Sequence, residues 1–508
     1  MVSQNFLLLS IMAVSAEIAC AQNFSSPAAV CHFFSQTHPN ITYYPNQTSY
    51  IEANTDYWSA AASLGPACIF SPTSTELMSF AVNTLVEYNA PFAIKGGGHM
   101  AIPGAANIDS SGVLLSSSNL NQLELSEDRR SVAVGPGNKW GEIFKYLEAF
   151  GLAAVGGRMS IVGVPGLLMG GGVSNFGNEF GWASSNIDAY TQCVLSNGYI
   201  VTANATNEYA DLFWALRGGG NSFCLITNFQ MRTIEVPVMT GGQRAYGSGD
   251  AVGNAFLDSV YEMTVNPDPD VKGALTPIAR AGDSLNGTTY NAMLFYNGNN
   301  TEPEFFANFS APILTPEQDT FAVLPGMGAA AEAMSEGTDQ VLGLREGWWV
   351  LSITADRAAM QIIHDTYFAM VREHFANVSG WITGLTFNIV SKNMVVAGIT
   401  GGGDPMGLDP TKAPYLWVEQ SITWTSADDD STVQAFYDAV NANITAQLEP
   451  LGVLDKFLYM NDVNQKQDVF AGYPRSSVQL LQMIRDKYDP GMVFTNQMPG
   501  GFKVANAF

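Results

Sequence analysis

Residues 91–99 read Pro-Phe-Ala-Ile-Lys-Gly-Gly-Gly-His, and this stretch decides how the rest of the chain is interpreted. Residues 91–94 predict a short buried strand that runs directly into three glycines. Glycine lets successive backbone N–H groups converge on an anion and lets the backbone approach a ligand closely. Further glycine clusters stand at residues 135–137 and 163–172. A single such loop is most simply a tight turn, but three of them together with His99 favour a cradle for a phosphate-bearing cofactor.

The hydrophobic pattern changes along the chain. Residues 70–235 alternate short helical and strand patterns, whereas residues 237–462 contain longer helical patterns, as at 355–375 and 431–448, between strand-like runs such as 415–424. The second pattern is typical of an antiparallel sheet with helices on one face. We therefore expect an α+β protein with these parts: a cofactor-binding domain at 22–236, with its core at about 60–236; a substrate domain at 237–462; and a C-terminal segment at 463–508 that returns to the first domain.

Composition excludes several classes of protein. The 508 residues include 22 Lys+Arg and 46 Asp+Glu, a net charge of −24, and no cationic patch is visible, so we expect no nucleic-acid partner. With 47% hydrophobic and 13% charged residues, the chain has ample material for a core and is not a disordered protein. After residue 21 no apolar run approaches the roughly 18 residues of a membrane span, so no membrane partner is expected. No Cys/His spacing indicates a metal site.

The N-terminus predicts export. Residues 1–21 are interpreted as a signal peptide, because an apolar run at 6–14 is followed by Ala19-Cys20-Ala21, a small-x-small cleavage site. Sequons for N-glycosylation support a secreted, glycosylated protein. They begin at Asn23, Asn40, Asn46, Asn204, Asn286, Asn299, Asn308, Asn377 and Asn443.

The cysteines are interpreted in the same light. Cys31 and Cys68 lie in the N-terminal segment and are proposed as a disulfide, as secreted proteins commonly contain; the alternative is a pair of free buried thiols. Cys193 and Cys224 lie in predicted strands, and we expect both to be packing residues.

At this point several motifs carry a family resemblance. Residues 95–99, with Gly104 after them, resemble the pyrophosphate loop of the berberine-bridge-enzyme-like FAD oxidoreductases, a group of the vanillyl-alcohol-oxidase superfamily with a PCMH-type FAD-binding domain. Segments 132–142, 162–172 and 211–220 are similar to other motifs of that family, and so are the C-terminal segments 459–461, 487–490 and 499–503. The resemblance covers about residues 55–504 and is to fungal-type secreted members.

The resemblance implies a cofactor and its contacts. His99 matches the histidine that is bonded to the 8α-methyl carbon of FAD, and Met159 stands where bicovalent members have a cysteine, so the expected FAD linkage is monocovalent through His99. The residues expected to contact the cofactor are Lys95, Gly96, Gly97, Gly98, Met100, Gly104, Gly157, Val162, Gly163, Gly166, Gly170, Gly171, Gly172, Asn175, Ile226 and Asn461.

The resemblance also implies a reaction. The expected function is a secreted oxidase that transfers a hydride from a small alcohol, amine or secondary-metabolite intermediate to FAD, with O₂ reoxidising the flavin to give H₂O₂. Candidates for the catalytic base are Tyr459, Tyr473 and Glu419, with Tyr459 ranked first. Two alternatives stay open: an oxidase of oligosaccharide C1 hydroxyls, against which Met159 counts, and a binding glycoprotein without catalysis. The aromatic residues at 348, 349 and 417 are more simply packing residues than cleft residues.

Overall fold

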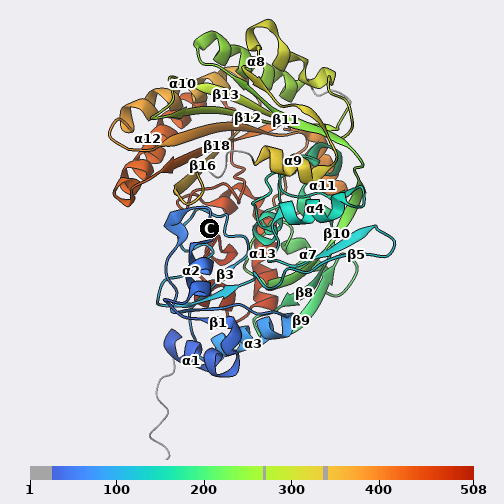
Figure 1. The fold of residues 1–508 in the computed structure, drawn as a ribbon, viewed down its shortest axis with the longest axis vertical. Coiled ribbons are helices and arrows are strands. Elements are labelled where there is room, and N and C mark those ends of the chain that lie inside the picture. Colours follow the sequence, from blue (N-terminus) through green and yellow to red (C-terminus); the bar gives the residue numbers. More distant parts are fainter. Residues whose placement is uncertain (1–25, 267–269, 336–340, 508) are drawn as a thin grey trace, which may run out of the picture.

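The computed structural model describes residues 26–266, 270–335 and 341–507 of the chain. The predicted signal peptide at 1–21 and the sequon at Asn23 lie outside these residues. Three sheets make up two units, one above the other in Figure 1. The lower unit holds the first two sheets, and the upper unit holds the third.

The first sheet is small, mixed and deeply buried. Its order is β1-β2-β4-β3, in which β2, β4 and β3 run parallel and β1 is antiparallel to β2. Every residue of the central strand β4 is buried, as expected for a parallel strand covered on both faces. The elements of this part are α1 (Pro27–Thr37), β1 (Thr42–Tyr43), α2 (Thr48–Thr55), β2 (Cys68–Phe70), α3 (Thr75–Glu87), β3 (Phe92–Lys95) and β4 (Val113–Ser116).

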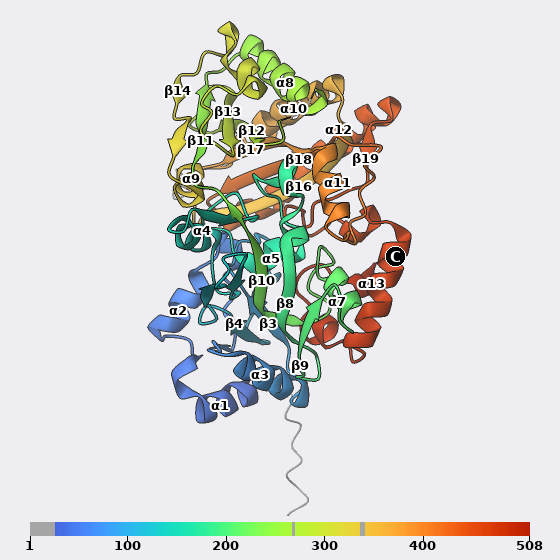
Figure 2. The same ribbon diagram turned by 90° about the vertical axis from the view of Figure 1, so that its right-hand side faces the viewer.

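The second sheet is antiparallel and lies beside the first. Its order is β5-β6-β10-β8-β9, and β7 pairs with the far end of β10. The glycine segment at 163–172 forms the loop and short helix α5 that pass over this sheet (Figure 2). The elements are β5 (Leu123–Leu125), β6 (Ser131–Val134), α4 (Trp140–Glu148), β7 (Leu152–Ala154), α5 (Val164–Met169), α6 (Gly177–Phe180), β8 (Ile187–Val194), β9 (Ile200–Asn204), α7 (Ala210–Ala215) and β10 (Leu225–Glu235).

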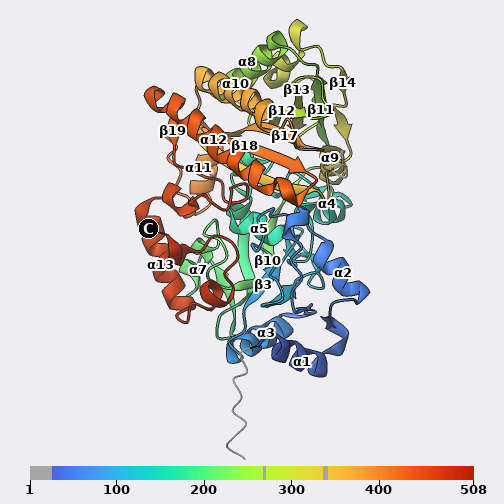
Figure 3. The same ribbon diagram turned by 90° about the vertical axis from the view of Figure 1, so that its left-hand side faces the viewer.

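The third sheet has nine antiparallel strands, and one of its faces is covered by the helices α8, α10 and α12 (Figures 1 and 3). Its order is β14-β11-β13-β12-β17-β18-β16-β19, with β15 paired to β11. The elements are β11 (Met239–Tyr246), α8 (Asp250–Val265), β12 (Gly273–Gly282), β13 (Thr289–Tyr296), β14 (Gln318–Asp319), β15 (Ala322–Leu324), α9 (Met327–Met334), β16 (Arg345–Thr354), α10 (Arg357–His374), β17 (Ile382–Val390), α11 (Lys392–Thr400), β18 (Tyr415–Trp424), α12 (Asp430–Leu448) and β19 (Leu454–Asp455).

The opposite face of this sheet is directed toward the lower unit. We call it the inner face: it carries the residues of β12, β16, β17 and β18 that line a cavity between the units. The expected α+β fold, with an antiparallel sheet and helices on one of its faces, is confirmed.

The chain ends by returning to the lower unit. Helix α13 (Arg475–Tyr488) packs beside α7, although more than 250 residues separate them in sequence (Figure 2). Lys487 Nζ lies 2.7 Å from a carboxylate oxygen of Asp211 on α7, and the Tyr488 hydroxyl donates to the other oxygen of that carboxylate. These bonds attach the last part of the chain to the unit in which it began.

The cysteines lie as expected. Cys31 on α1 and Cys68 on β2 form a disulfide, with their Cα atoms 5.8 Å apart. Cys193 and Cys224 are free and buried in the core.

Of the helices in the described part of the chain, none has the length and apolar character to cross a membrane. Nor do the described residues bring together three or more side chains able to hold a metal ion.

Candidate active site

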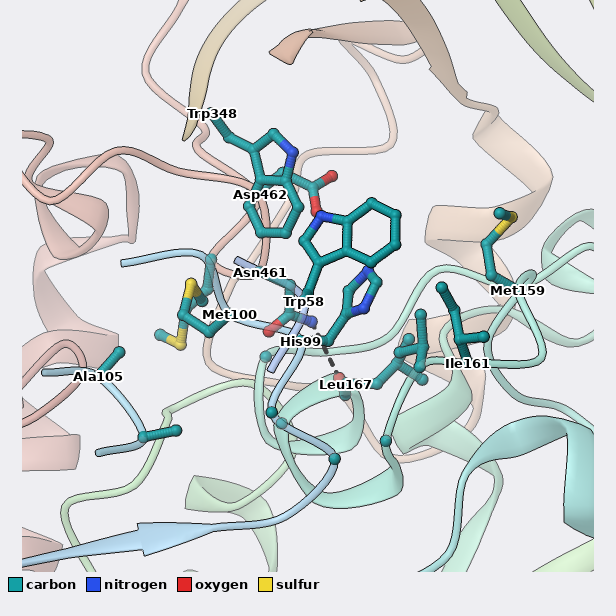
Figure 4. A pocket seen from close by; sticks show the side chains of 18 of the residues that line it. Trp58, His99, Met100, Ala105, Met159, Ile161, Leu167, Trp348, Asn461 and Asp462 are labelled. Atoms are coloured by element: carbon teal, nitrogen blue, oxygen red, sulfur yellow. Dashed lines mark hydrogen bonds between the residues drawn. The ribbon is translucent and has the colours of Figure 1, made fainter. Parts of the chain in front are cut away.

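A cavity of about 480 Å³ lies between the two units. Three segments of the lower unit line it: the loop after β3 with His99, the segment from Arg158 through α5, and residues 220–226. The inner face of the third sheet and residues 459–462 close it from the other side. Figure 4 shows His99, Met159 and Leu167 around this space, with Trp348 and Asp462 across from them.

Two of the glycine loops touch through their backbones. A Cβ atom on Gly97 would lie 2.4 Å from the Cα of Gly163, and one on Gly96 would lie 2.4 Å from the ring of Pro165. Both distances are far below van der Waals contact, so only glycine allows this approach. Gly166 differs, because a Cβ atom there would meet no protein atom within 4 Å although the residue lines the cavity. The two loops are thus in backbone contact at Gly97 and Gly163, while the backbone at Gly166 is accessible from the cavity.

His99 packs against two tryptophan side chains, with the rings tilted by 34° and 35°. Its ring centroid is 4.9 Å from that of Trp58 and 5.8 Å from that of Trp348, and Figure 4 shows the two indoles on one side of the imidazole. Burial, with a smaller effect of Lys139, lowers the pKa of His99 to about 4. At neutral pH the imidazole is therefore uncharged, and one ring nitrogen has a free electron pair.

A polar cluster lies on the inner face around Arg158. The Arg158 Nη1 atom donates to Thr276 Oγ1 and to Asn388 Oδ1, both at 2.8 Å. The amide of Asn388 in turn makes a long contact of 3.5 Å with Glu419 Oε2. Asp462 accepts a hydrogen bond of 3.1 Å from the indole N–H of Trp417. Arg158, Glu419 and Asp462 all line the cavity.

The two carboxyl groups of this cluster hold protons more tightly than usual. Burial raises the pKa of Glu419 against the opposing effect of Arg158, and burial together with Glu419 raises the pKa of Asp462 well above its usual range. A carboxyl group with a raised pKa beside a cavity is a recurrent property of catalytic acids and bases.

The hydroxyl of Tyr459 is engaged on both sides. It accepts hydrogen bonds from the Val173 backbone N–H at 2.9 Å and from the Asn461 amide at 3.0 Å. The Asn461 amide also donates to the Leu167 carbonyl, drawn as the dashed line in Figure 4. Burial raises the pKa of Tyr459, so its hydroxyl keeps its proton at neutral pH. These bonds join residues 459–461 to the segment around α5.

Glu346 is a third carboxyl group at the cavity, on β16. The residue is 4% exposed, and its Oε1 atom is buried without a hydrogen-bond partner in the described part of the chain. Burial raises the pKa of Glu346 to about 9. This carboxyl group is therefore neutral at pH 7.

The structure brings many of the predicted site residues to the cavity and leaves others elsewhere. Those that line it are Gly96, Gly97, Gly98, His99, Met100, Val162, Gly163, Gly166, Gly170, Ile226, Glu419, Tyr459 and Asn461. Those that do not are Lys95, Gly104, Gly157, Gly171, Gly172, Asn175 and Tyr473.

Several of the second group have structural contacts that explain their position. The Lys95 ammonium turns away and donates to Asp56 and to the Ala53 carbonyl. Gly157 lies against the indole of Trp140. The Tyr473 hydroxyl donates at 2.6 Å to the Gly218 carbonyl, which leaves it no proton to exchange with a ligand in the cavity. The structure thus places Tyr473 outside the candidate active site.

Sequence reasoning missed five of the polar and aromatic residues that line the cavity, which are Trp58, Arg158, Glu346, Trp348 and Asp462. Trp348 was expected to be a packing residue. Consecutive residues of a strand point to opposite faces of the sheet, so only one of Trp348 and Trp349 could be expected to face a cavity. Trp348 lines the cavity, while Trp349 stacks on Tyr437 on the other face.

Fold and site together define a two-unit protein with a cradle for a cofactor. The glycine loops, closed against each other at Gly97 and open at Gly166, fit a ligand that lies along bare backbone, and His99 stands at its edge. The cradle fits FAD, and the residues that would hold it are those of the lower unit that line the cavity.

Comparisons with known proteins agree with this assignment. Residues 66–204 match the model of an FAD binding domain family. The chain is 29% identical to the FAD-dependent monooxygenase prx3 of Penicillium roqueforti, over 99% of this chain and 98% of that protein. It is 30% identical to the FAD-dependent monooxygenase tpcD of Cochliobolus heterostrophus, over 86% of this chain and 85% of that protein.

A solved structure shares the fold. The berberine bridge enzyme of Eschscholzia californica superposes with a TM-score of 0.72 at 17% identity, over 95% of this chain and all of that one. The chain belongs to the family of FAD-linked oxidoreductases that includes tpcD, and it has the fold of the berberine bridge enzyme. It is a flavin-dependent oxidoreductase.

Proposed function

We propose that the protein is an oxidase that takes a hydride from a small, largely apolar alcohol, amine or secondary-metabolite intermediate, with FAD attached to His99 and reoxidised by O₂ to give H₂O₂. Bound FAD supplies the hydride acceptor. The observation that carries the proposal is the position of Glu419 and Arg158 in a cavity whose surface is mostly apolar. Ile278, Met293, Met334 and Ile382 contribute to that apolar surface.

The position of His99 supports a covalent tether. The lowered pKa leaves its imidazole neutral, with an electron pair that would form a bond to the 8α carbon of FAD; a C–H bond of that methyl group would be lost, and its two electrons would pass to the flavin and then to O₂. Trp58 and Trp348 restrict the ring by packing against it. Met159 lines the same cavity and offers a thioether instead of a thiol, which supports a single covalent bond.

Glu419 is the stronger candidate for the base. Tyr459 accepts two hydrogen bonds and keeps its proton, so it suits orientation of the substrate and of residues 459–461. Glu419 lines the cavity with a raised pKa, and its carboxylate form can take the proton of a substrate O–H or N–H as the hydride departs from carbon. Arg158 lies close enough to stabilise the carboxylate.

The mostly apolar surface of the cavity favours this substrate class over an oligosaccharide, whose many hydroxyl groups would each require a polar partner there. The proteins prx3 and tpcD are both named monooxygenases. The two kinds of enzyme differ in their products: an oxidase releases H₂O₂, whereas a monooxygenase transfers an oxygen atom to its substrate.

We also propose that the protein is secreted and N-glycosylated. All but one of the sequon asparagines in the described part are exposed; Asn204 is half-buried. Surface exposure is what glycan attachment requires. Enzymatic deglycosylation of protein recovered from culture medium, followed by mass measurement, tests both points, and unmodified protein retained in cells would contradict them.

The test of the redox function uses purified protein. It should be yellow and keep its flavin after acid precipitation, whereas His99→Ala should release the flavin into the supernatant. Peroxide release measured across apolar alcohols, amines and oligosaccharides then assigns the substrate class. Colourless protein contradicts the flavoenzyme proposal. Stoichiometric substrate oxygenation without peroxide replaces the oxidase reaction by a monooxygenase reaction.

The role of Glu419 has a matched comparison in the same assay. Glu419→Gln keeps size and hydrogen bonding but removes the base, so flavin reduction should slow by about 10² to 10⁴, the usual contribution of general base catalysis. Tyr459→Phe should slow it much less. The reverse order would assign the base to Tyr459.

A further inference from the structure

Glu346 is a buried carboxyl group at the cavity to which the proposed reaction assigns no role. Its backbone N–H donates to Ser59 Oγ at 2.9 Å, which holds this end of β16 in place. Its side chain lines the cavity, and its Oε1 atom is buried without a partner among the described residues. A buried polar atom without a partner destabilises a fold unless something else satisfies it. A ligand in the cavity is the group available to do so.

The carboxyl group also has no cation beside it in the described part of the chain. The adjacent Arg345 is turned to Asp430, with which it forms an ion pair. Burial therefore acts unopposed and keeps a proton on Glu346 at neutral pH. A protonated carboxyl group is a hydrogen-bond donor, unlike a carboxylate, which only accepts.

A second donor stands on the same face of the sheet. Strand register places Glu346 opposite Thr423, and it places Trp348 opposite Ser421, which in turn is opposite Gly384. Gly384 lies opposite Arg280 on β12, so Arg280 belongs to the same face of the sheet but lies three strands away from β16. Arg280 lines the cavity and forms no hydrogen bond or ion pair with the described residues. Guanidinium groups donate hydrogen bonds and never accept them.

We propose that Glu346 is a recognition site for a hydrogen-bond-accepting oxygen, such as a ketone, lactone or ether oxygen, on the part of the substrate remote from the reacting carbon, with Arg280 as a second donor three strands away on the same face. This proposal depends on the proposed function in one respect only, which is that the substrate binds in this cavity. Thr423, opposite Glu346, is four residues along β18 from Glu419, which corresponds to about 13 Å of strand. A substrate that reaches from Glu419 to this site therefore has the length of a compound of two or three fused rings.

The donors also select against cationic substrates. An ammonium group beside Glu346 would meet a neutral carboxyl group and no carboxylate, and the positive charge of Arg280 stands on the same face of the sheet. The site thus favours an apolar compound with oxygen acceptors over an amine of the same shape. This narrows the substrate class of the proposed oxidase.

The test measures binding to the holoenzyme at pH 7 by calorimetry, with three probes of one shape: 2-acetylnaphthalene, 2-ethylnaphthalene and 1-(2-naphthyl)ethylamine. The ketone should bind about tenfold more tightly than the hydrocarbon, the order expected for one net hydrogen bond. Glu346→Gln should keep this preference, because the amide also donates. Glu346→Leu, which has similar bulk and no donor, should lose most of it, and Arg280→Met should weaken it.

Other results would overturn the proposal. A wild-type protein that shows no preference for the ketone, or a preference unchanged in Glu346→Leu with its melting temperature intact, removes the recognition site. Tightest binding of the amine, lost in Glu346→Gln, would make Glu346 an ionised partner for cations. Glu419→Gln separates this site from the catalytic proposal, because it should slow flavin reduction while leaving the ketone preference as it is.

Discussion

Gly166 and Gly97 provide a paired test of the cofactor cradle. Gly166 lies inside helix α5, and a Cβ atom there would meet no protein atom within 4 Å although the residue lines the cavity. Gly166→Ala should therefore leave the fold intact and even stabilise it by up to about 1 kcal/mol through helix propensity. In a domain of this size that is a rise in melting temperature of roughly 2 to 4 °C for flavin-free protein.

The same methyl group should hinder the cofactor. Adding a methylene-sized group to a well-packed contact costs about 1 to 3 kcal/mol. Since about 1.4 kcal/mol is a factor of ten in affinity, the dissociation constant for FAD should rise roughly 5- to 150-fold. The assay is a flavin fluorescence titration in a His99→Ala background, where no covalent bond obscures the equilibrium.

Gly97→Ala should behave in the opposite way. Its Cβ atom would lie 2.4 Å from the Cα of Gly163, so the two loops must separate. Flavin-free protein should then melt at a lower temperature, by an amount that corresponds to about 2 kcal/mol or more. An unchanged FAD affinity in Gly166→Ala, together with an unchanged melting temperature in Gly97→Ala, would refute the cradle as described.

Three further predictions concern other parts of the molecule. Replacing Cys31 and Cys68 by serine should cost about 2 to 4 kcal/mol, seen as a lower melting temperature that a reducing agent no longer affects; equal sensitivity to reductant in both proteins would contradict this. Because a base works only when deprotonated and burial raises the pKa of Glu419, flavin reduction should speed up as pH rises through a value above the usual range for glutamate, and a pH-independent rate would exclude this role. Trp58→Ala removes one of the two indoles that pack against His99, so it should slow covalent attachment of FAD, measured as the fraction of acid-stable flavin over time. An unchanged rate would show that Trp58 does not orient the imidazole.

Local pattern was enough to predict the elements of the substrate unit. The strand-like run at 415–424 matches β18, and the helix predicted at 431–448 corresponds to α12. Amphipathic periodicity is a local property, so it can be identified without knowledge of the fold. The glycine loops could also be located, because a close backbone approach restricts the residue type directly, as the contact between Gly97 and Gly163 shows.

The polar side of the cavity could not be predicted in the same way. Arg158 bonds Thr276 and Asn388, residues more than a hundred positions away, and its role depends on how the third sheet is placed over the lower unit. Glu346 is one acid among many in an acidic chain, and only its burial distinguishes it. Tyr473 is among the expected bases, but its hydroxyl donates to the Gly218 carbonyl in the lower unit, a contact between segments far apart in sequence.

The return of the chain to its starting unit has a consequence for biosynthesis. Tyr459 and Asn461 bond Val173 and the Leu167 carbonyl, and α13 packs on α7, so the pocket wall is complete only after residues 459–488 have been synthesised. A chain that stops before residue 459 has the loop with His99 but not a complete pocket. The proposed attachment of FAD to His99 therefore requires synthesis beyond this point, and a chain truncated before it should be colourless.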